Sequence, residues 1–144
     1  MAKPRVFVSY ARGDEKSSRL MGSLSEALRT AGVGVWLDNT SIAPGQDWIS
    51  GIERALEDSE TFVFLLSPRA LKSDWTNFEM GVAARRAAQS RNVRIIPVLV
   101  GGTDWGSVPA FLHRKSAIDA DKASEDEVAA AVTRAVTSDM TAGD

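Results

Sequence analysis

Cysteine is missing from this chain of 144 residues, which excludes disulfide bonds and thiolate metal ligands. Histidine is nearly missing as well: the one copy, His113, stands beside Arg114 and Lys115 and is expected to lie at the surface. The chain therefore lacks a cluster of histidine, cysteine and carboxylate side chains with metal-ligand spacing. We expect no metal site and no bound cofactor.

Long apolar runs are missing too. The longest, Ile95–Val100, is interrupted by Pro97 and falls far short of the roughly 20 residues that a membrane helix needs. The segment from Met1 to Arg5 leads directly into a strand-like segment, without the apolar stretch of a signal peptide. We expect a protein that is not bound to a membrane, with the cytoplasm as its location.

A strongly basic face is the third absence. The net charge is −2. Residues 119–144 hold seven acidic and two basic side chains, a charge of −5, which leaves +3 for the rest of the chain. A weakly basic body suits a small anionic ligand better than DNA or RNA, whose binding needs clustered basic residues. We therefore expect no direct binding of nucleic acid.

What the chain does contain is a regular alternation of two kinds of segment. Short apolar runs typical of buried strands alternate with amphipathic segments typical of helices. The predicted strands cover residues 5–10, 33–37, 61–67, 93–100 and 115–119, and the main predicted helices cover 15–31, 47–56, 75–90 and 124–136. This alternation predicts an α/β fold, a flavodoxin-like doubly wound five-stranded parallel sheet with helices on both faces. One domain accounts for the length, with a core over about residues 5–138 and a flexible tail over 139–144.

Three local details are expected within this frame. Pro97 lacks a backbone donor, which indicates an edge or bulge position for the fourth strand. Phe78, in the long helix, is expected to point into the core. Ser124 and Glu127 have the spacing of a capping box at the start of the last helix.

A functional site is expected at one edge of this sheet. In a doubly wound sheet, ligands bind outside the carboxyl ends of the strands. The loops that follow the predicted strands at that edge are residues 10–14, 38–47, 67–74 and 101–108.

Four segments in these regions resemble the sequence boxes of TIR domains, in the same order and at suitable spacing. The similarity extends from residue 5 to about residue 119. The four segments are Phe7–Tyr10; Trp36–Asp38 followed by Ile42–Gly45; Leu65–Pro68 followed by Ser73, Trp75 and Glu79; and Ile95–Val98. The resemblance implies the fold derived above and, for the NAD⁺-cleaving members of the family, an enzyme.

Glu79 is the residue that the resemblance singles out. By position alone, a glutamate near the start of a helix is most simply a solvated side chain that complements the helix macrodipole. NAD⁺-cleaving TIR domains carry their catalytic glutamate at the matching place, behind the tryptophan that corresponds to Trp75. Nicotinamide leaves NAD⁺ as a neutral amine, so one carboxylate that stabilises the remaining oxocarbenium-like ribose is enough, without a metal.

The resemblance also implies substrate contacts in the neighbouring loops. Trp75 either packs against the nicotinamide ring or anchors its helix, and Arg12 either pairs with the diphosphate or is solvated. Trp36 is expected to pack in the core, with ligand stacking as the alternative. The remaining candidates are Tyr10 in the first loop and, for the ribose hydroxyls, Asp38 and Ser41.

The loop from Asn39 to Trp48 corresponds to the BB loop of the family. Its Pro44-Gly45 pair predicts a turn in which Gly45 takes a positive φ. TIR domains use this loop to contact a neighbouring subunit, and exposed apolar side chains of the sort that interfaces use occur on or beside it. We expect homotypic association, into an oligomer or filament, through Ile42, Pro44, Gly45 and Trp48.

The resemblance thus implies a NAD⁺ glycohydrolase or cyclase that releases nicotinamide and either ADP-ribose or a cyclic isomer. NAD⁺ is then the substrate rather than a cofactor. Bacterial domains of this type serve antiviral defence and can be joined to a sensor domain. A non-catalytic TIR–TIR adaptor is the alternative. A nucleoside deoxyribosyltransferase fits the loop pattern less well, and a response-regulator receiver is excluded because Ser9-Tyr10 and Ser67-Pro68 stand where it needs acidic residues.

Overall fold

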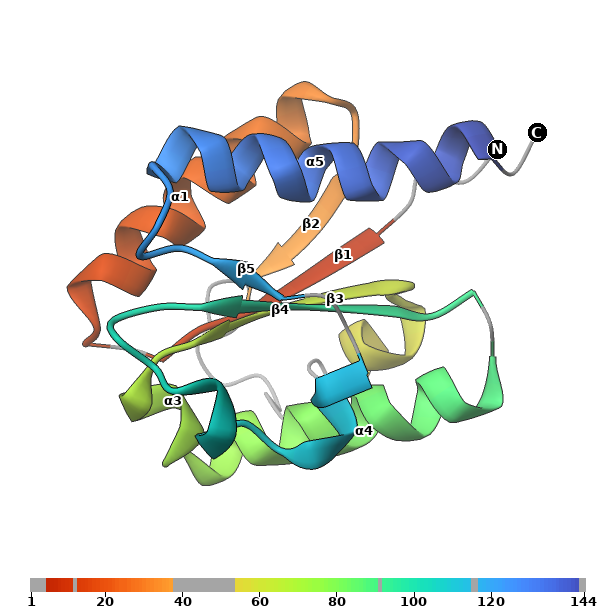
Figure 1. The fold of residues 1–144 in the computed structure, drawn as a ribbon. Coiled ribbons are helices and arrows are strands. Elements are labelled where there is room, and N and C mark those ends of the chain that lie inside the picture. Colours follow the sequence, from red (N-terminus) through yellow and green to blue (C-terminus); the bar gives the residue numbers. More distant parts are fainter. Residues whose placement is uncertain (1–4, 12, 38–53, 91, 115–116, 143–144) are drawn as a thin grey trace, which may run out of the picture.

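The computed structural model describes residues 5–11, 13–37, 54–90, 92–114 and 117–142, and these form a parallel sheet between two layers of helices (Figure 1). The strand order is β2-β1-β3-β4-β5, with every neighbouring pair parallel. This is the flavodoxin-like order, so the fold predicted from the alternation of segments is confirmed.

The strands are β1 (Arg5–Ser9), β2 (Gly34–Leu37), β3 (Thr61–Leu66), β4 (Arg94–Leu99) and β5 (Ile118–Asp119). All six residues of β3 are buried, because this central strand is covered on both faces and has a neighbour on each side. An unbroken apolar run is the sequence signature of such a strand. Within the described residues, Ile118 and Asp119 pair with β4, and residues 115–116 of the predicted strand lie outside the described part of the chain.

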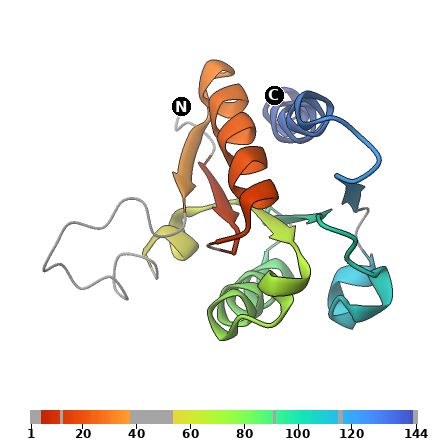
Figure 2. The ribbon, with the colours of Figure 1, turned by 90° about the vertical axis from the view of Figure 1, so that its left-hand side faces the viewer.

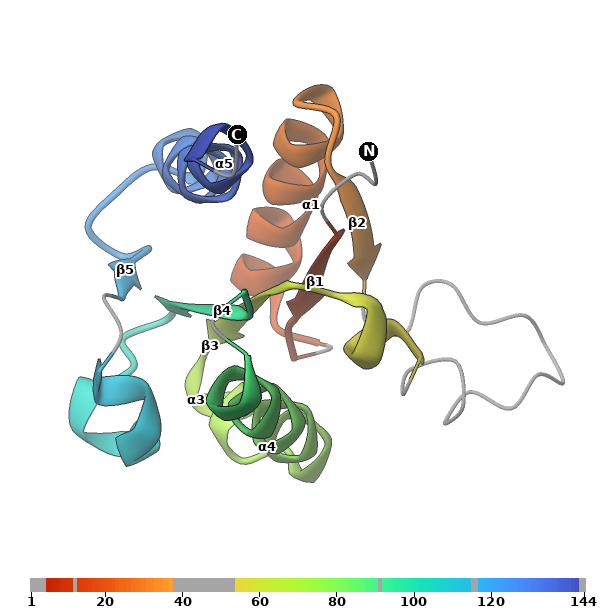
Figure 3. The ribbon, with the colours of Figure 1, turned by 90° about the vertical axis from the view of Figure 1, so that its right-hand side faces the viewer.

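One face of the sheet is covered by α1 (Glu15–Thr30) and α5 (Glu125–Ala142), which lie side by side in Figures 2 and 3. The apolar sides of the two helices pack against the alternate strand residues that point to this face, among them Val6 and Val8, in one cluster of buried side chains. Ser124 and Glu127 form the predicted capping box: the Ser124 hydroxyl accepts from the Glu127 N–H, and the Glu127 carboxylate accepts from the Ser124 N–H, both at 3.1 Å. α5 continues to Ala142, so most of the predicted tail is helical.

The opposite face is covered by α4 (Asp74–Gln89) and a helical segment over residues 54–58, with the 3₁₀ turns η1 (Trp105–Ser107) and η2 (Ala110–Arg114) alongside. Arg86 of α4 joins two of these parts. Its guanidinium donates to the carbonyls of Leu56 and Ser59 and lies 5.6 Å from the centre of the Phe62 ring. Leu56 lies in the last turn of segment 54–58 and Ser59 directly follows it, where backbone acceptors have no partner within the helix.

Phe78 departs from the prediction. Its side chain is 43% exposed, whereas its neighbours Glu79 and Met80 are buried. α4 packs against the sheet through the side of the helix that carries these two residues, which turns Phe78 outward by about 100° per residue. The expectation that Phe78 points into the core was wrong.

Pro97 also differs from the expectation, because β4 lies inside the sheet rather than at its edge. The N–H groups of Arg94 and Val100 donate to carbonyls on the β3 side of β4, so residues of odd number turn their backbone groups toward β5. β5 begins opposite Val98 and does not reach Pro97. The proline therefore removes a donor at a position where the described residues of β5 form no pair with β4.

None of the helices formed by the described residues is long and apolar enough to cross a membrane.

Candidate active site

The site lies at the carboxyl edge of the sheet, between β1 and β3. The order β2-β1-β3 means that the chain leaves β1 toward one side and β3 toward the other. At such a switch point the loops after the two strands diverge and leave a crevice, which is where α/β sheets bind ligands. Ser9 is the last residue of β1, and Ser67 directly follows β3.

Glu79 of α4 reaches this switch point. Its Oε1 atom accepts a hydrogen bond of 2.7 Å from the hydroxyl of Ser9. Glu79 is 0% exposed and Ser9 is 1% exposed. Glutamate is almost never fully buried in proteins unless it is paired, because its carboxylate loses its hydration. The carboxylate therefore has a donor in β1, 70 residues away in the sequence.

The start of α4 determines where Glu79 lies. Ser73 caps the helix by accepting a hydrogen bond of 3.2 Å from the N–H of Thr76. The helix begins at Asp74, so Glu79 lies in its second turn. A solvated glutamate that complements the macrodipole is thereby excluded, since the side chain is buried against the sheet.

The short helix α3 (Pro68–Leu71) follows β3 at the same edge, at the lower left of Figure 1. Its cap is Ser67, whose hydroxyl accepts from the N–H of Ala70 at 3.1 Å. Arg69 lies against Gly13 so closely that a Cβ atom at Gly13 would stand 2.3 Å from an Arg69 guanidinium nitrogen. Gly13 has φ +82°, a conformation that other residues rarely adopt. The loop after β1 and the loop after β3 are in this way packed together beside the switch point.

A second group at the carboxyl edge ties three elements together around Asp121. Its carboxylate accepts from the N–H groups of Gly101 and Gly102, at 3.1 and 2.6 Å, and pairs with Lys16 of α1. The hydrogen bond from Lys16, followed by that from Gly102, lowers the pKa of Asp121. These donors already bind the Asp121 carboxylate, so the contacts have a structural role: they connect α1 to the loops after β4 and β5.

Two of the residues proposed for substrate binding, Tyr10 and Trp36, pack against neighbouring side chains. Tyr10 packs against the cluster under α1 and α5, on the face opposite to α4, because it follows Ser9 and side chains alternate along a strand. Trp36 packs against Phe7, with ring centroids 5.1 Å apart and planes inclined by 9°. Trp36 thus has a packing contact with Phe7, and its part in ligand binding stays a prediction.

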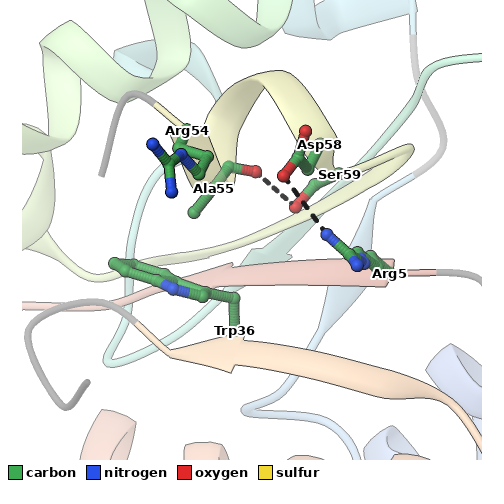
Figure 4. Close-up of a pocket in the computed structure, with 6 residues that line it drawn as sticks. All are labelled: Arg5, Trp36, Arg54, Ala55, Asp58 and Ser59. Atoms are coloured by element: carbon green, nitrogen blue, oxygen red, sulfur yellow. Dashed lines mark hydrogen bonds and ion pairs between the residues drawn. The ribbon is translucent and has the colours of Figure 1, made fainter. Parts of the chain in front are cut away.

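Trp36 also lines a cavity of about 190 Å³ that the close-up in Figure 4 shows between β1, β2 and the helical segment over 54–58. An ion pair of 3.2 Å between Arg5 and Asp58 crosses the cavity wall. Arg5 is the first residue of β1, so this end of the cavity lies near the amino edge of the sheet, whereas Ser9 ends the same strand. The cavity and the Ser9–Glu79 pair are separate features. The complete lining is Arg5, Trp36, Arg54, Ala55, Asp58 and Ser59.

The remaining proposed residues lie, with the side chain or as a whole, outside the described part of the chain. Trp75 belongs to the first turn of α4, and its side chain lies outside the described part of the chain. Seven further proposed residues, among them the four interface positions, lie entirely outside the described residues: Arg12, Asp38, Ser41, Ile42, Pro44, Gly45 and Trp48.

Ser9 is the functional candidate that the sequence did not reveal. A polar residue at the end of an apolar strand is usual. Ser9 lies two residues after Phe7, which faces α4, and only this spacing would have indicated that the Ser9 hydroxyl points to the same face. His113 is exposed, as expected, and contacts Trp105 through ring stacking at 4.8 Å. Among the described residues, no group of three or more histidine or carboxylate side chains could hold a metal ion.

Comparison with known proteins gives this edge a context. The NAD(+) hydrolase PdTIR of Paracoccus denitrificans (strain Pd 1222) is 28% identical over 127 residues, which cover 87% of this chain and 42% of that protein. The 2' cyclic ADP-D-ribose synthase AbTIR of Acinetobacter baumannii (strain 1295743) is 33% identical over 81 residues, 56% of this chain and 29% of that protein. The chain thus spans less than half the length of these relatives.

Solved structures agree in fold. A metazoan TIR-STING receptor from C. gigas superimposes with a TM-score of 0.70 at 23% identity, over 91% of this chain and 39% of the other. The TIR domain family matches residues 6–136, which include every described strand except the first residue of β1, and nearly all of the described helices. The chain belongs to the TIR domain family.

Proposed function

We propose that this chain cleaves the bond between nicotinamide and ribose in NAD⁺, with the Glu79 carboxylate as the catalytic group. The observation that carries the proposal is the burial of this carboxylate at the β1/β3 switch point, held by Ser9 at 2.7 Å. An apolar side chain or a glutamine could fill the same position at a lower desolvation cost. A buried carboxyl group at the ligand-binding edge of a sheet is therefore better explained by chemistry than by stability.

The chemistry needs one carboxylate. The C1′–N bond breaks and its electron pair goes to the nicotinamide nitrogen, which leaves as a neutral molecule. Positive charge remains on C1′ and the ring oxygen of the ribose, where an adjacent carboxylate stabilises it. In hydrolysis, water attacks C1′ and releases one proton, which Glu79 can accept and pass to solvent. In cyclisation, a nitrogen of the adenine or a ribose hydroxyl attacks the same carbon.

The names of two relatives support this assignment. One is called a NAD(+) hydrolase and the other a 2' cyclic ADP-D-ribose synthase. Both reactions begin with loss of nicotinamide and differ only in the group that attacks C1′. Loss of nicotinamide is accordingly the step that we assign to this chain. A role in bacterial antiviral signalling is the biological context that we propose for it.

Access to Glu79 requires movement, since its side chain is 0% exposed. The groups that cover the carboxylate have to move aside before a ribose can contact it. We propose that homotypic TIR–TIR association supplies part of the energy for this change, with NAD⁺ as the ligand of the opened site. The cleavage rate per molecule is then expected to rise with protein concentration.

The test is incubation of the purified chain with NAD⁺ over a range of protein concentrations, with the products resolved by mass spectrometry. Wild type, Glu79→Ala and Glu79→Gln are compared with Glu26→Gln, an exposed glutamate of α1. We expect nicotinamide release by wild type and by Glu26→Gln, and its loss in both Glu79 variants. Persistent cleavage by Glu79→Ala would refute the catalytic role. Absence of cleavage by every form would favour the alternative, a non-catalytic TIR–TIR interaction module.

A further inference from the structure

We infer that Ser9 is a positioning residue for Glu79: its hydroxyl orients the carboxylate and favours its ionised form. The inference rests on the proposed function for its consequence in catalysis. It rests on geometry for the contact itself, since the hydroxyl donates to Oε1 of Glu79 at 2.7 Å. That distance is typical of an O–H···O hydrogen bond.

Ser9 is mounted rigidly. β1 has a strand on each side, and Ser9 pairs with Phe64 in the register of β3. The serine side chain has a single heavy-atom torsion, so its oxygen is placed by the strand almost directly. Glu79 has three side-chain torsions and reaches the site from a helix. The strand-borne hydroxyl of Ser9 therefore fixes the position of Oε1 of Glu79. Because the carboxylate is planar, this contact also orients the second oxygen.

Burial makes the contact matter. Ser9 and Glu79 are 1% and 0% exposed, so water cannot simply replace the hydroxyl if it is removed. A hydrogen bond donated to a carboxylate stabilises its charged form over its protonated form. The proposed chemistry requires the charged form, because a protonated acid does not stabilise a developing cation. Ser9 thus acts through Glu79 and has no need to touch the substrate.

Removal of the hydroxyl has a specific kinetic signature. For Ser9→Ala we expect kcat for nicotinamide release to fall about 10- to 100-fold, the order of loss that a displaced catalytic group produces, with KM changed less than threefold. We also expect the acidic limb of the pH–rate profile to move to higher pH by about one pH unit. Ser9→Thr keeps the hydroxyl and is expected to restore most of the rate and the original pH profile.

A readout that needs no activity separates this inference from the proposed function. The carboxyl carbon of Glu79 is followed by ¹³C NMR through a pH titration, with Glu79→Gln used to assign the signal. We expect the midpoint in Ser9→Ala to lie above that in wild type. The matched control is Ser25→Ala. It removes another buried serine hydroxyl, one without a hydrogen-bond partner among the described residues and on the face covered by α1 and α5. This variant is expected to leave both the titration and the kinetics unchanged.

The outcomes are distinct. An unchanged Glu79 midpoint in folded Ser9→Ala overturns the inference, whether or not NAD⁺ is cleaved. So does a lower melting temperature with unchanged kcat and pH profile, because that combination describes a purely structural serine. If no form cleaves NAD⁺ but the midpoint rises as expected, the proposed function fails while the coupling of Ser9 to Glu79 stands.

Discussion

Arg86 offers the sharpest test of how the α4 layer is held together. Its guanidinium donates to the carbonyls of Leu56 and Ser59 and lies over the ring of Phe62. Each hydrogen bond from a charged donor contributes about 1.5–3 kcal/mol to stability, so the two together contribute roughly 3–6 kcal/mol. Because the Arg86 side chain is only half-buried, we take the lower end of that range. Arg86→Met keeps most of the apolar stem and is expected to lower the free energy of unfolding by about 3 kcal/mol. For a domain of this size, that corresponds to a melting temperature lower by roughly 10 °C.

The assay is thermal unfolding followed by circular dichroism. Arg85→Met is the matched control, because Arg85 is the neighbouring arginine on α4 and is exposed. We expect it to change the free energy of unfolding by no more than about 0.5 kcal/mol. Arg86→Lys keeps the charge but not the planar fork, so its melting temperature should fall between those of wild type and Arg86→Met. Equal melting temperatures for Arg86→Met and Arg85→Met would refute the reasoning.

Three further predictions concern stability and pH. Because the pKa of Asp121 is lowered in the folded state, its ionised carboxylate stabilises the fold at pH values above its usual pKa of 3.8. This contribution to the free energy of unfolding is lost as the pH falls through the folded-state pKa. Asp121→Asn should therefore melt below wild type at pH 7, and the two melting temperatures should converge as the pH falls through the folded-state pKa of Asp121, which lies below 3.8; a constant gap would contradict this and the ion pair with Lys16. Ser124→Ala removes a helix cap and should cost about 1 kcal/mol in a denaturant titration, whereas Ser138→Ala, later on the exposed side of α5, should cost nothing measurable. Pro97→Ala restores an N–H where β5 does not reach, so its unfolding free energy should stay within about 1 kcal/mol of wild type, and a clear gain would disprove the assigned direction.

The fold could be predicted because its rules act locally. The unbroken apolar run over β3, the alternation of strands with amphipathic helices, and the capping box at Ser124 each depend on neighbouring residues. Each of these predictions is confirmed. The direction of Phe78 was not predictable in the same way, because α4 has a mixed composition and its buried side is chosen by the sheet beneath it.

The candidate site could be predicted only in part. Its location at the carboxyl edge follows from the strand order, and Glu79 was identified from a resemblance rather than from its surroundings. The contact between Glu79 and Ser9 joins residues 70 positions apart, so it depends on the register of β1 with β3 and on the approach of α4. Nothing in the local sequence around Ser9 distinguishes it from a serine that simply ends a strand. The burial of Glu79 likewise became visible only in the folded chain.

The most direct test of the central claim is the rate of nicotinamide release from NAD⁺ by Glu79→Gln relative to wild type at the same high protein concentration. Glutamine keeps the shape of the side chain and an oxygen that can accept from Ser9, so the change removes charge and little else. Equal melting temperatures within a few degrees would establish that both chains are folded. We predict a loss of about 10³-fold or more in rate, because the carboxylate is the group that stabilises the ribosyl cation. Release by Glu79→Gln at the wild-type rate would contradict the account.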